Sequence, residues 1–282
     1  MQRRCVHAPL TTTLPRRGHS YRTGAPRPYR RRVPFVEDFA GSDLDRTTWL
    51  PSYLPVWSST AASAATYAVS NGRLVLRIPP EQGLWCAGDH EPPLRVSGIQ
   101  SGAYSGPVGS TRGQQRFREG QVVREAQPRF EGWLPAGRVE VRCAMTVSPR
   151  SMAALWLSGF EDDPAQEQCG ELCVVEVFGK DVDPGRSAEV GVGIKPFRDP
   201  ALHQDFAAPR LPIDVAAFHT YAVEWDASAA VFTVDGEEVR RCARPPTYPM
   251  QVMVGVFDFP GWSAGDDDHL VPELEVDWIR GR

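Results

Sequence analysis

The sequence has no apolar run long enough to cross a membrane. Its longest apolar stretches, such as residues 250–257, are far shorter than the roughly 20 residues that span a bilayer. The six cysteines are too few for a disulfide-dense mini-scaffold, and the charged fraction of 23% excludes a charge-dominated disordered chain. What is present is an apolar fraction of 41% in 282 residues, which is enough for a sizeable core in one large domain.

Positive charge is concentrated at the beginning of the chain. Nine arginines precede the first acidic residue, Glu37, although the net charge of the whole chain is −4. Residues 1–32 are therefore expected to form a basic, disordered leader, and the acidic remainder argues against a nucleic-acid partner for the folded domain. Because no apolar segment of the secretory type occurs in the chain as given, no signal peptide is expected, and the localisation stays open.

From residue 33 onward, apolar residues alternate with other residues in many short segments. The clearest are 74–78, 139–145, 221–225, 252–256 and 274–278. A period of two is that of a strand with one buried face, and in the last segment it places Leu274, Val276 and Trp278 on the same face. Residues 33–282 are therefore predicted to be one all-β domain, an antiparallel β-sandwich of two sheets.

Turn residues separate these strands. Asn71-Gly72 precedes one strand, and Asp235-Gly236 lies between two apolar runs, which is a hairpin signature. The section 85–129 differs, because it is rich in Gly, Ser, Arg and Gln and alternates weakly. Long loops on a rigid sandwich often carry function, so this section is interpreted as binding loops.

The most informative segment is 169–179, an apolar strand that contains two carboxylates, Glu171 and Glu176. In a regular strand, residues five apart point to opposite faces. A β-bulge at Val174-Val175 would insert one residue and turn Glu176 onto the face of Glu171 and Cys173. Two carboxyls about 5 to 5.5 Å apart suit retaining glycoside hydrolysis. The alternative is that Glu171 lies in water at a strand end and Glu176 on an outer face.

This segment resembles the signature strand of glycoside hydrolase family 16, which runs Glu, aliphatic, Asp, aliphatic, an optional extra residue and Glu. Further stretches resemble other parts of that family in the same order: 37–49, 137–142, 154–157, 218–225 with 234–236, and 275–280. The resemblance implies a concanavalin A-like jelly roll that binds a polysaccharide or oligosaccharide across its concave sheet. It also implies that Glu171 is the nucleophile and Glu176 the general acid/base of an endo-acting enzyme on a β-glucan or galactan.

Cys173 departs from the family motif, which has Asp at this position. A thiol is a weak hydrogen-bond donor and is neutral when buried, so a slower enzyme or a changed pH optimum is expected. Met152-Ala153 stands where the family often has Trp-Pro, and Lys195 where a His commonly lies. Lys195 is either a solvated strand residue or a cation that selects anionic glycans.

Several other residues are candidates for substrate or metal binding. Trp156 and Trp225 lie in family-like strands and are expected on the concave face; Trp133 in a loop could line the cleft, and Arg112 and Gln115 could bind hydroxyls. No organic cofactor is expected. Family members often carry a structural Ca²⁺, for which Asp38 and Asp277 are the positions to inspect, and the run 266–268 is interpreted as a solvated acidic turn.

The six cysteines have no metal-like spacing and are expected to be free, although a bridge between Cys143 and Cys169 is conceivable. The chain is expected to be a monomer. Two functions stay open: a family 16-like hydrolase, or a lectin-like sugar-binding protein in which Cys173 has disabled turnover. A sandwich with neither activity is a third alternative, against which the retained glutamate pair counts.

Overall fold

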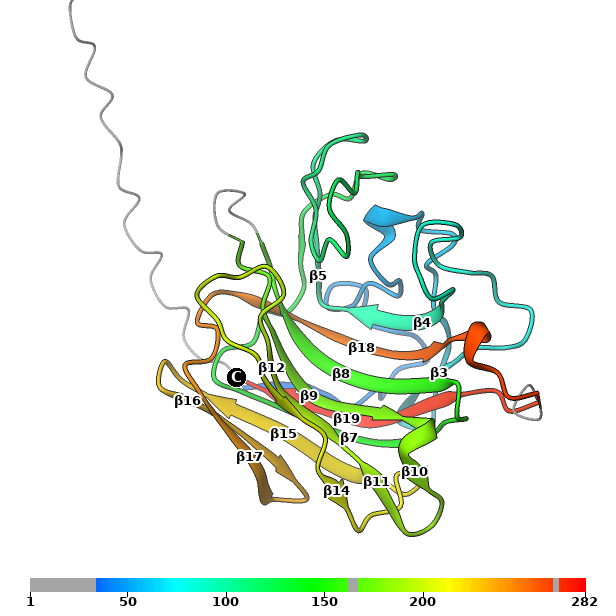
Figure 1. Ribbon diagram of the computed structural model, residues 1–282, viewed down its shortest axis with the longest axis vertical. Coiled ribbons are helices and arrows are strands. Elements are labelled where there is room, and N and C mark those ends of the chain that lie inside the picture. The colour runs from blue at the N-terminus through cyan, green and yellow to red at the C-terminus, as the bar shows by residue number, and fades with distance from the viewer. Residues whose placement is uncertain (1–33, 162–166, 266–268) are drawn as a thin grey trace, which may run out of the picture. The chain divides into compact units, whose positions relative to one another are not determined.

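Two antiparallel β-sheets face each other in the computed structural model, which describes residues 34–161, 167–265 and 269–282 (Figure 1). The described residues fall in one compact unit. The leader predicted for residues 1–32, its Cys5, and the acidic run 266–268 lie outside the described residues.

The larger sheet has eight strands. In spatial order they are β17 (Glu237–Ala243), β16 (Ala229–Val234), β15 (His219–Trp225), β7 (Arg138–Thr146), β19 (Glu273–Gly281), β3 (Arg73–Arg77) and β2 (Thr66–Ser70), and β1 (Phe35–Glu37) also pairs with β19. The second sheet has six strands in the order β13 (Asp205–Ala207), β12 (Gly191–Lys195), β9 (Glu171–Phe178), β8 (Ser151–Gly159), β18 (Met250–Asp258) and β4 (Arg95–Gln100).

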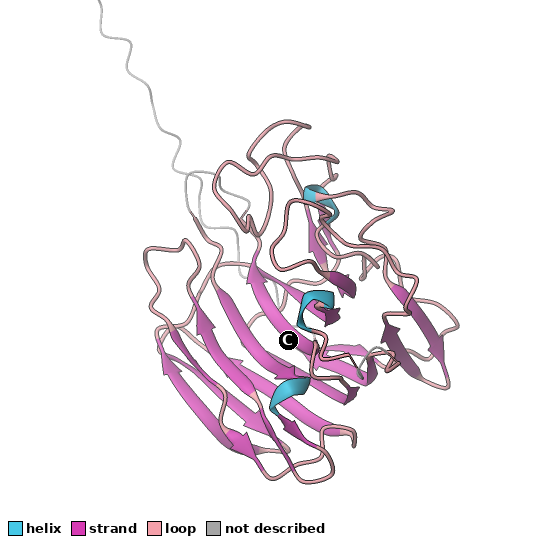
Figure 2. Cartoon of the chain, turned by 45° about the vertical axis from the view of Figure 1, so that its right-hand side comes forward, coloured by secondary structure: helices cyan, strands magenta, loops and turns pink. Residues whose placement is uncertain are grey.

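Small elements decorate the edges of the two sheets. They are a three-stranded sheet of β10 (Val182–Asp183), β11 (Ser187–Glu189) and β14 (Arg210–Leu211), a pair of β5 (Gly102–Ala103) and β6 (Phe130–Glu131), and the 3-10 turns η1 (Pro55–Trp57), η2 (Gly179–Asp181) and η3 (Pro260–Trp262). Figure 2 shows how few residues are helical. The predicted all-β, two-sheet antiparallel sandwich is confirmed. None of the described helices is long and apolar enough to span a bilayer.

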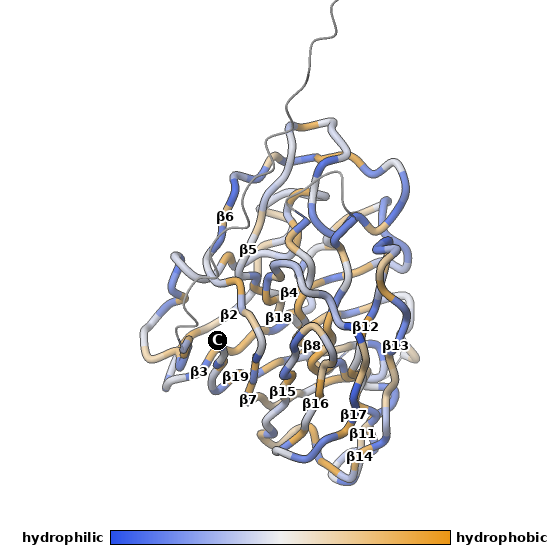
Figure 3. Tube along the Cα trace, turned by 90° about the vertical axis from the view of Figure 1, so that its left-hand side faces the viewer, coloured by the Kyte–Doolittle hydropathy of each residue, from blue (hydrophilic) through white to orange (hydrophobic). Residues whose placement is uncertain are grey.

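The six-stranded sheet is buried on both faces. One apolar cluster fills the space between the two sheets, and a second cluster covers the other face of the six-stranded sheet beneath loops. Every residue of β8 and of β18 is buried for this reason. Apolar residues accordingly concentrate along the strands, while hydrophilic residues lie in the peripheral loops (Figure 3). Strands covered on both faces read as continuous apolar runs, as in β18.

Both expected turns close two-residue hairpins. Asn71 and Gly72 have φ of 54° and 70° between β2 and β3, and Asp235 and Gly236 have φ of 50° and 87° between β16 and β17. Positive φ at both central residues is the requirement of a type I′ turn, which Asn, Asp and Gly tolerate best.

The period-two prediction fails at one strand end. The register of β19 shifts between Val276 and Trp278, so Ile279 is buried and Trp278 is partly exposed. The guanidinium of Arg280 lies over the Trp278 ring, 4.1 Å from its centroid. A bulge of this kind reverses the alternation beyond it.

A strand was also missed inside the expected loop section. Arg95–Gln100 forms β4, which pairs with β18 at the edge of the six-stranded sheet. Its centre is Ser97-Gly98, and neither residue favours a strand. Five of its six residues are nevertheless buried, so tertiary packing overrides local propensity.

Candidate active site

One extra residue in β9 brings two glutamates onto the same face of the six-stranded sheet. Leu155 pairs with Val175 and Trp156 with Cys173, so Val174 has no partner on β8. The register between β9 and β12 shifts at the same place. The predicted bulge at Val174-Val175 is therefore confirmed.

The bulge sorts the side chains of β9. Leu172, Val174, Val175 and Val177 belong to the core between the sheets. Cys173 belongs to the cluster on the other face, and Glu171 and Glu176 line a cavity of about 250 Å³ on that same face. The alternative in which Glu171 lies in water at a strand end is wrong, because that residue is 6% exposed.

Hydrogen bonds fix the Glu171 carboxylate. The side-chain amide of Gln115 donates to Glu171 Oε1 at 2.9 Å and also contacts the hydroxyl of Ser158. Gln115 is itself held by its backbone N–H, which donates to Glu161 Oε2 at 2.6 Å. The loop therefore adopts a left-handed φ of 55° at Gln115 in order to reach the floor of the cavity.

Burial dominates the ionisation of Glu171. The pKa of its carboxyl is raised from 4.5 to about 7; loss of water is the largest cause, and the charge of Glu176 acts in the same direction. Lys195 and the hydrogen bonds from Gln115 and Trp156 act in the opposite direction but do not cancel the effect of burial. Glu171 therefore carries a proton below neutral pH in the free protein.

Glu176 is paired with a lysine. Lys195 Nζ donates to Glu176 Oε2 at 2.7 Å, and the side chains are 24% and 15% exposed, respectively. Lys195 ends β12, where its Cα is paired with that of Glu171. Burial acts against the charge of Lys195, but its interactions with Cys173, Glu176 and Glu171 give a net rise in the pKa of its ammonium. Because Glu176 already matches this charge, the interpretation that Lys195 selects anionic glycans loses support.

Cys173 lies beside the first glutamate. Its thiol donates a weak hydrogen bond to Glu171 Oε2, with Sγ 4.0 Å from the oxygen. Burial raises the pKa of the Cys173 thiol well above its ordinary value, so the group is neutral. The site therefore has a weak, uncharged donor beside Glu171.

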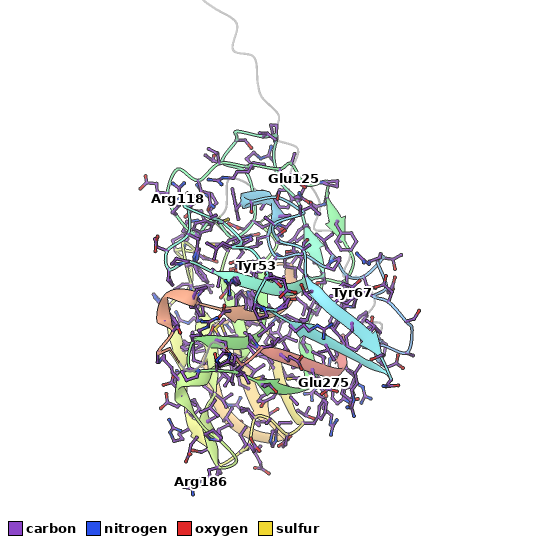
Figure 4. The ribbon with its side chains drawn as sticks, turned by 90° about the vertical axis from the view of Figure 1, so that its right-hand side faces the viewer. Tyr53, Tyr67, Arg118, Glu125, Arg186 and Glu275 are labelled. Atoms are coloured by element: carbon purple, nitrogen blue, oxygen red, sulfur yellow. The ribbon has the colours of Figure 1, made fainter. Side chains whose placement is uncertain are left out.

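Aromatic side chains form the walls of the cavity. Tyr53 packs against Trp85 and Phe257 with ring centroids 4.8 and 5.3 Å apart, and Phe117 lies 5.3 Å from Trp85. Figure 4 places Tyr53 where the loop layer, marked by Arg118 and Glu125, meets the six-stranded sheet. The remaining lining residues include His90, Met152, Trp156, Phe197 and Phe259. Flat apolar surfaces next to a few polar groups suit a sugar ring.

The structure brings some of the proposed substrate-binding residues together and separates others. Trp156 and Gln115 line the cavity, but Arg112, Trp133 and Trp225 do not. Trp225 belongs to β15 of the other sheet and packs into the core between the sheets, so its placement on the concave face was wrong. Trp133 stacks on Phe35 with centroids 3.8 Å apart, and Arg112 is exposed in its loop.

The expected calcium ligands do not form a suitable site. Asp277 Oδ2 accepts a hydrogen bond from Arg142 at 2.6 Å, and Arg73 lies 3.9 Å from its other oxygen. Asp38 accepts a hydrogen bond from the backbone N–H of Ala40. Within the described ranges, no group of three or more His, Cys, Asp or Glu side chains could hold a metal ion. An aspartate neutralised by two arginines is a poor ligand for Ca²⁺.

The described cysteines are all free. They are Cys86, Cys143, Cys169, Cys173 and Cys242, and all five are buried. The conceivable bridge between Cys143 and Cys169 is not formed, which agrees with the expectation of free thiols.

Sequence reasoning missed several residues of the cavity. Tyr53, His90 and Phe117 come from three separated loop segments, and Phe257 lies near the end of β18. The loop residues show no period that indicates a shared wall. For His90 and Phe117 the only signal was the loop-like composition of the section 85–129, which marks the region rather than the residues, and Tyr53 lies outside that section.

Comparison with known proteins places this geometry in a family. The sequence model described as glycosyl hydrolases family 16 matches residues 135–280, which include both glutamates and Lys195. A comparison with curated protein sequences gives no match.

Solved structures share the fold. The GlcNAcα1-4Gal-releasing endo-β-galactosidase of Clostridium perfringens is 24% identical with a TM-score of 0.73, over 92% of this chain and 63% of that one. This chain therefore spans less than two thirds of the length of that protein. The catalytic domain of a laminarinase from Thermotoga petrophila is 16% identical with a TM-score of 0.60, over 87% and 95% of the two chains, respectively.

A laminarinase from Flavobacterium sp. is 18% identical with a TM-score of 0.57, over 88% of this chain and 98% of that one. These neighbours are endo-acting or laminarin-cleaving glycanases by name, and all have the sandwich described above. With the family model matching just over half of its residues, the chain belongs to family 16 of the glycosyl hydrolases.

Proposed function

We propose that the protein cleaves a β-linked glycan internally with retention of configuration. The observation that carries the proposal is the bulge in β9, which directs Glu171 and Glu176 into the same cavity. Glu171, as carboxylate, attacks the anomeric carbon while Glu176 donates a proton to the leaving glycosidic oxygen. Glu176 then removes a proton from water, which hydrolyses the ester between the sugar and Glu171.

The proposed substrate is a neutral glycan of the β-glucan or galactan class. The cavity walls are mostly aromatic, and Lys195 already has an anionic partner in Glu176. A ligand with its own negative charge would meet two acidic groups and one cation there, which disfavours binding. The likeness to an endo-β-galactosidase and to laminarinases supports testing galactans and β-1,3-glucans first.

Hydrolysis is tested with the wild type, Glu171→Gln and Glu176→Gln on laminarin, lichenan, agarose, carrageenan and xyloglucan. The appearance of reducing ends is followed, and the anomer released first is identified by NMR. We expect one or more substrates to be cleaved by the wild type with the β-anomer as first product, and both variants to lose at least about 100-fold in rate. Glu189→Gln is the matched control, because Glu189 pairs with Arg210 in the small three-stranded sheet, away from the cavity.

The thiol at Cys173 supports a second candidate, a sugar-binding protein without turnover. The weak contact of Cys173 with Glu171 replaces the carboxyl partner of the family motif. In that case the wild type and Glu171→Gln would bind the same glycan with similar affinity, and neither would release reducing ends. This result would overturn the hydrolase proposal.

A further inference from the structure

The Glu176–Lys195 ion pair affects which of the two glutamates holds the single proton that a retaining site needs. Cleavage starts from an ionised nucleophile and a protonated acid. In this cavity the group assigned as acid accepts a 2.7 Å hydrogen bond from an ammonium, while the group assigned as nucleophile is buried. A nearby cation favours a carboxylate, and burial favours the neutral acid.

We infer that Lys195 is a positioning residue that determines which of the two glutamates carries the proton. In the free site it keeps Glu176 ionised and leaves the proton on Glu171, which is the reverse of the arrangement that cleavage needs. The inference rests on the proposed function, because it uses the roles given there to Glu171 and Glu176. Lys195 acts through Glu176 and is not assigned a contact with the reacting atoms.

The geometry of Lys195 supports a fixed pair. Its ammonium lies over the ring of Phe206, 4.4 Å from the centroid, so the aromatic face of β13 stabilises the cation on one side while Glu176 binds it on the other. Lysine is scarce in this chain: only two of the 31 Lys and Arg residues are lysines, and the other one is Lys180.

Cys173 and Glu171 are the other groups of the site that interact with Lys195. Besides Glu171, Glu176 and Lys195, the titratable groups that line the cavity are Tyr53 and His90, and Cys173 lies beside Glu171 on β9. His90 Nδ1 contacts the carbonyl oxygen of Pro92 at 2.8 Å. Among the described lining residues, Lys195 is therefore the one permanent cation.

Turnover then depends on transfer of the proton from Glu171 to Glu176. The state with a neutral Glu176 is a minority as long as Lys195 stays in place, which lowers the rate at saturating substrate. Replacing Lys195 by a neutral residue removes this bias. Because Lys195 forms its hydrogen bond with Glu176, its replacement shifts the shared proton from Glu171 toward Glu176.

The first test measures pH–rate profiles of Lys195→Met, Lys195→His and Lys195→Arg on a cleaved neutral glycan. We expect Lys195→Met to move the alkaline limb of kcat upward by at least about one pH unit and to raise kcat at the optimum. Lys195→Arg should keep the wild-type limbs because it keeps the charge. Lys180→Met is the matched control, since Lys180 pairs with the exposed Asp181 outside the cavity. A lower kcat with unmoved limbs would overturn the inference.

The second test needs no turnover. Reductive methylation with ¹³C labels the two lysines and the α-amino group, and it keeps their charge. The signal that is lost in Lys195→Met is that of Lys195, and it is followed by NMR as the pH is lowered. We expect two steps, of which the upper one disappears in Glu171→Gln and the lower one in Glu176→Gln.

The reverse assignment, with the upper step lost in Glu176→Gln, would overturn the inference even if the hydrolase proposal holds. Conversely, the expected pattern in a protein that cleaves no glycan would overturn the proposed function and leave the proton arrangement standing. The two failures are therefore distinguishable.

Discussion

A single buried carboxyl group, that of Glu171, links the site to the stability of the protein. Its pKa is about 7 in the folded protein against an ordinary value of 4.5. Between these values the folded protein keeps a proton that the unfolded chain has released, so the free energy of unfolding falls as the pH rises through this window.

Glu171→Gln removes this titration. Relative to the wild type, we expect the variant to gain about 2 kcal/mol more stability at pH 8 than at pH 5. Urea unfolding at the two pH values measures the difference, with Glu189→Gln as the control that should show none. An equal effect of Glu171→Gln at both pH values would contradict the assignment of a raised pKa.

The thiol of Cys173, which lies beside Glu171, leads to a second prediction. In Cys173→Asp the new carboxyl lies next to Glu171 and can share a proton with it, which the weak donor Sγ at 4.0 Å cannot do. We expect turnover to rise roughly tenfold and stability to fall by about 1 to 3 kcal/mol, because another polar group is buried. Initial rates and urea unfolding measure the two effects. Cys173→Ser is the control for loss of sulfur, and an unchanged or lower rate in Cys173→Asp would mean that the site is adapted to the thiol.

The bulge of β9 leads to a prediction about the strand as a whole. Deleting Val174 leaves Glu171 and Glu176 four residues apart, so regular alternation keeps both on the cavity face while Val175 and Val177 stay in the core. We expect hydrolysis to persist and the free energy of unfolding to fall by about 2 kcal/mol, because one buried valine side chain is lost while both carboxylates keep their direction.

Val174→Ala is the matched control for this deletion. It keeps the residue count of β9, so the bulge and the direction of Glu176 persist, and the loss is that of a buried side chain, about 2 kcal/mol. Rates and thermal melts of both variants separate register from packing. Loss of activity in the deletion variant alone would mean that the spacing of the two glutamates along β9 matters as well as the face that they share.

The sequence predicts some of the strands and misses others. Alternation identifies β3, β7 and β15, and the spacing of Glu171 and Glu176 predicts the bulge in β9. Alternation does not locate β4, whose Ser97-Gly98 centre has little strand propensity and is held by packing against β18. The Glu176–Lys195 pair was equally hidden, because residues 19 positions apart meet only once the register of β9 and β12 is known.

The cavity belongs to the molecule as a whole. Its floor comes from β8 and β9, while Tyr53, Trp85 and Phe117 approach from separate loops above the sheet. Each of these loops owes its position to packing against the second apolar cluster. Local sequence patterns therefore predict the glutamates on the floor better than the aromatic walls, which exist only after the two layers have formed.

The walls lead to a prediction about affinity. Phe117 is half-buried at the rim, where its ring packs on Trp85 and His90 with centroids 5.3 and 5.1 Å away. In Phe117→Ala we expect KM to rise about fivefold to tenfold, the loss of one ring contact, with kcat changed less than twofold. Phe218→Ala is the control, because Phe218 packs under Arg73 and Arg142 on the eight-stranded sheet. A fall in kcat at constant KM would instead mean that Phe117 orders the catalytic pair rather than contacts the glycan.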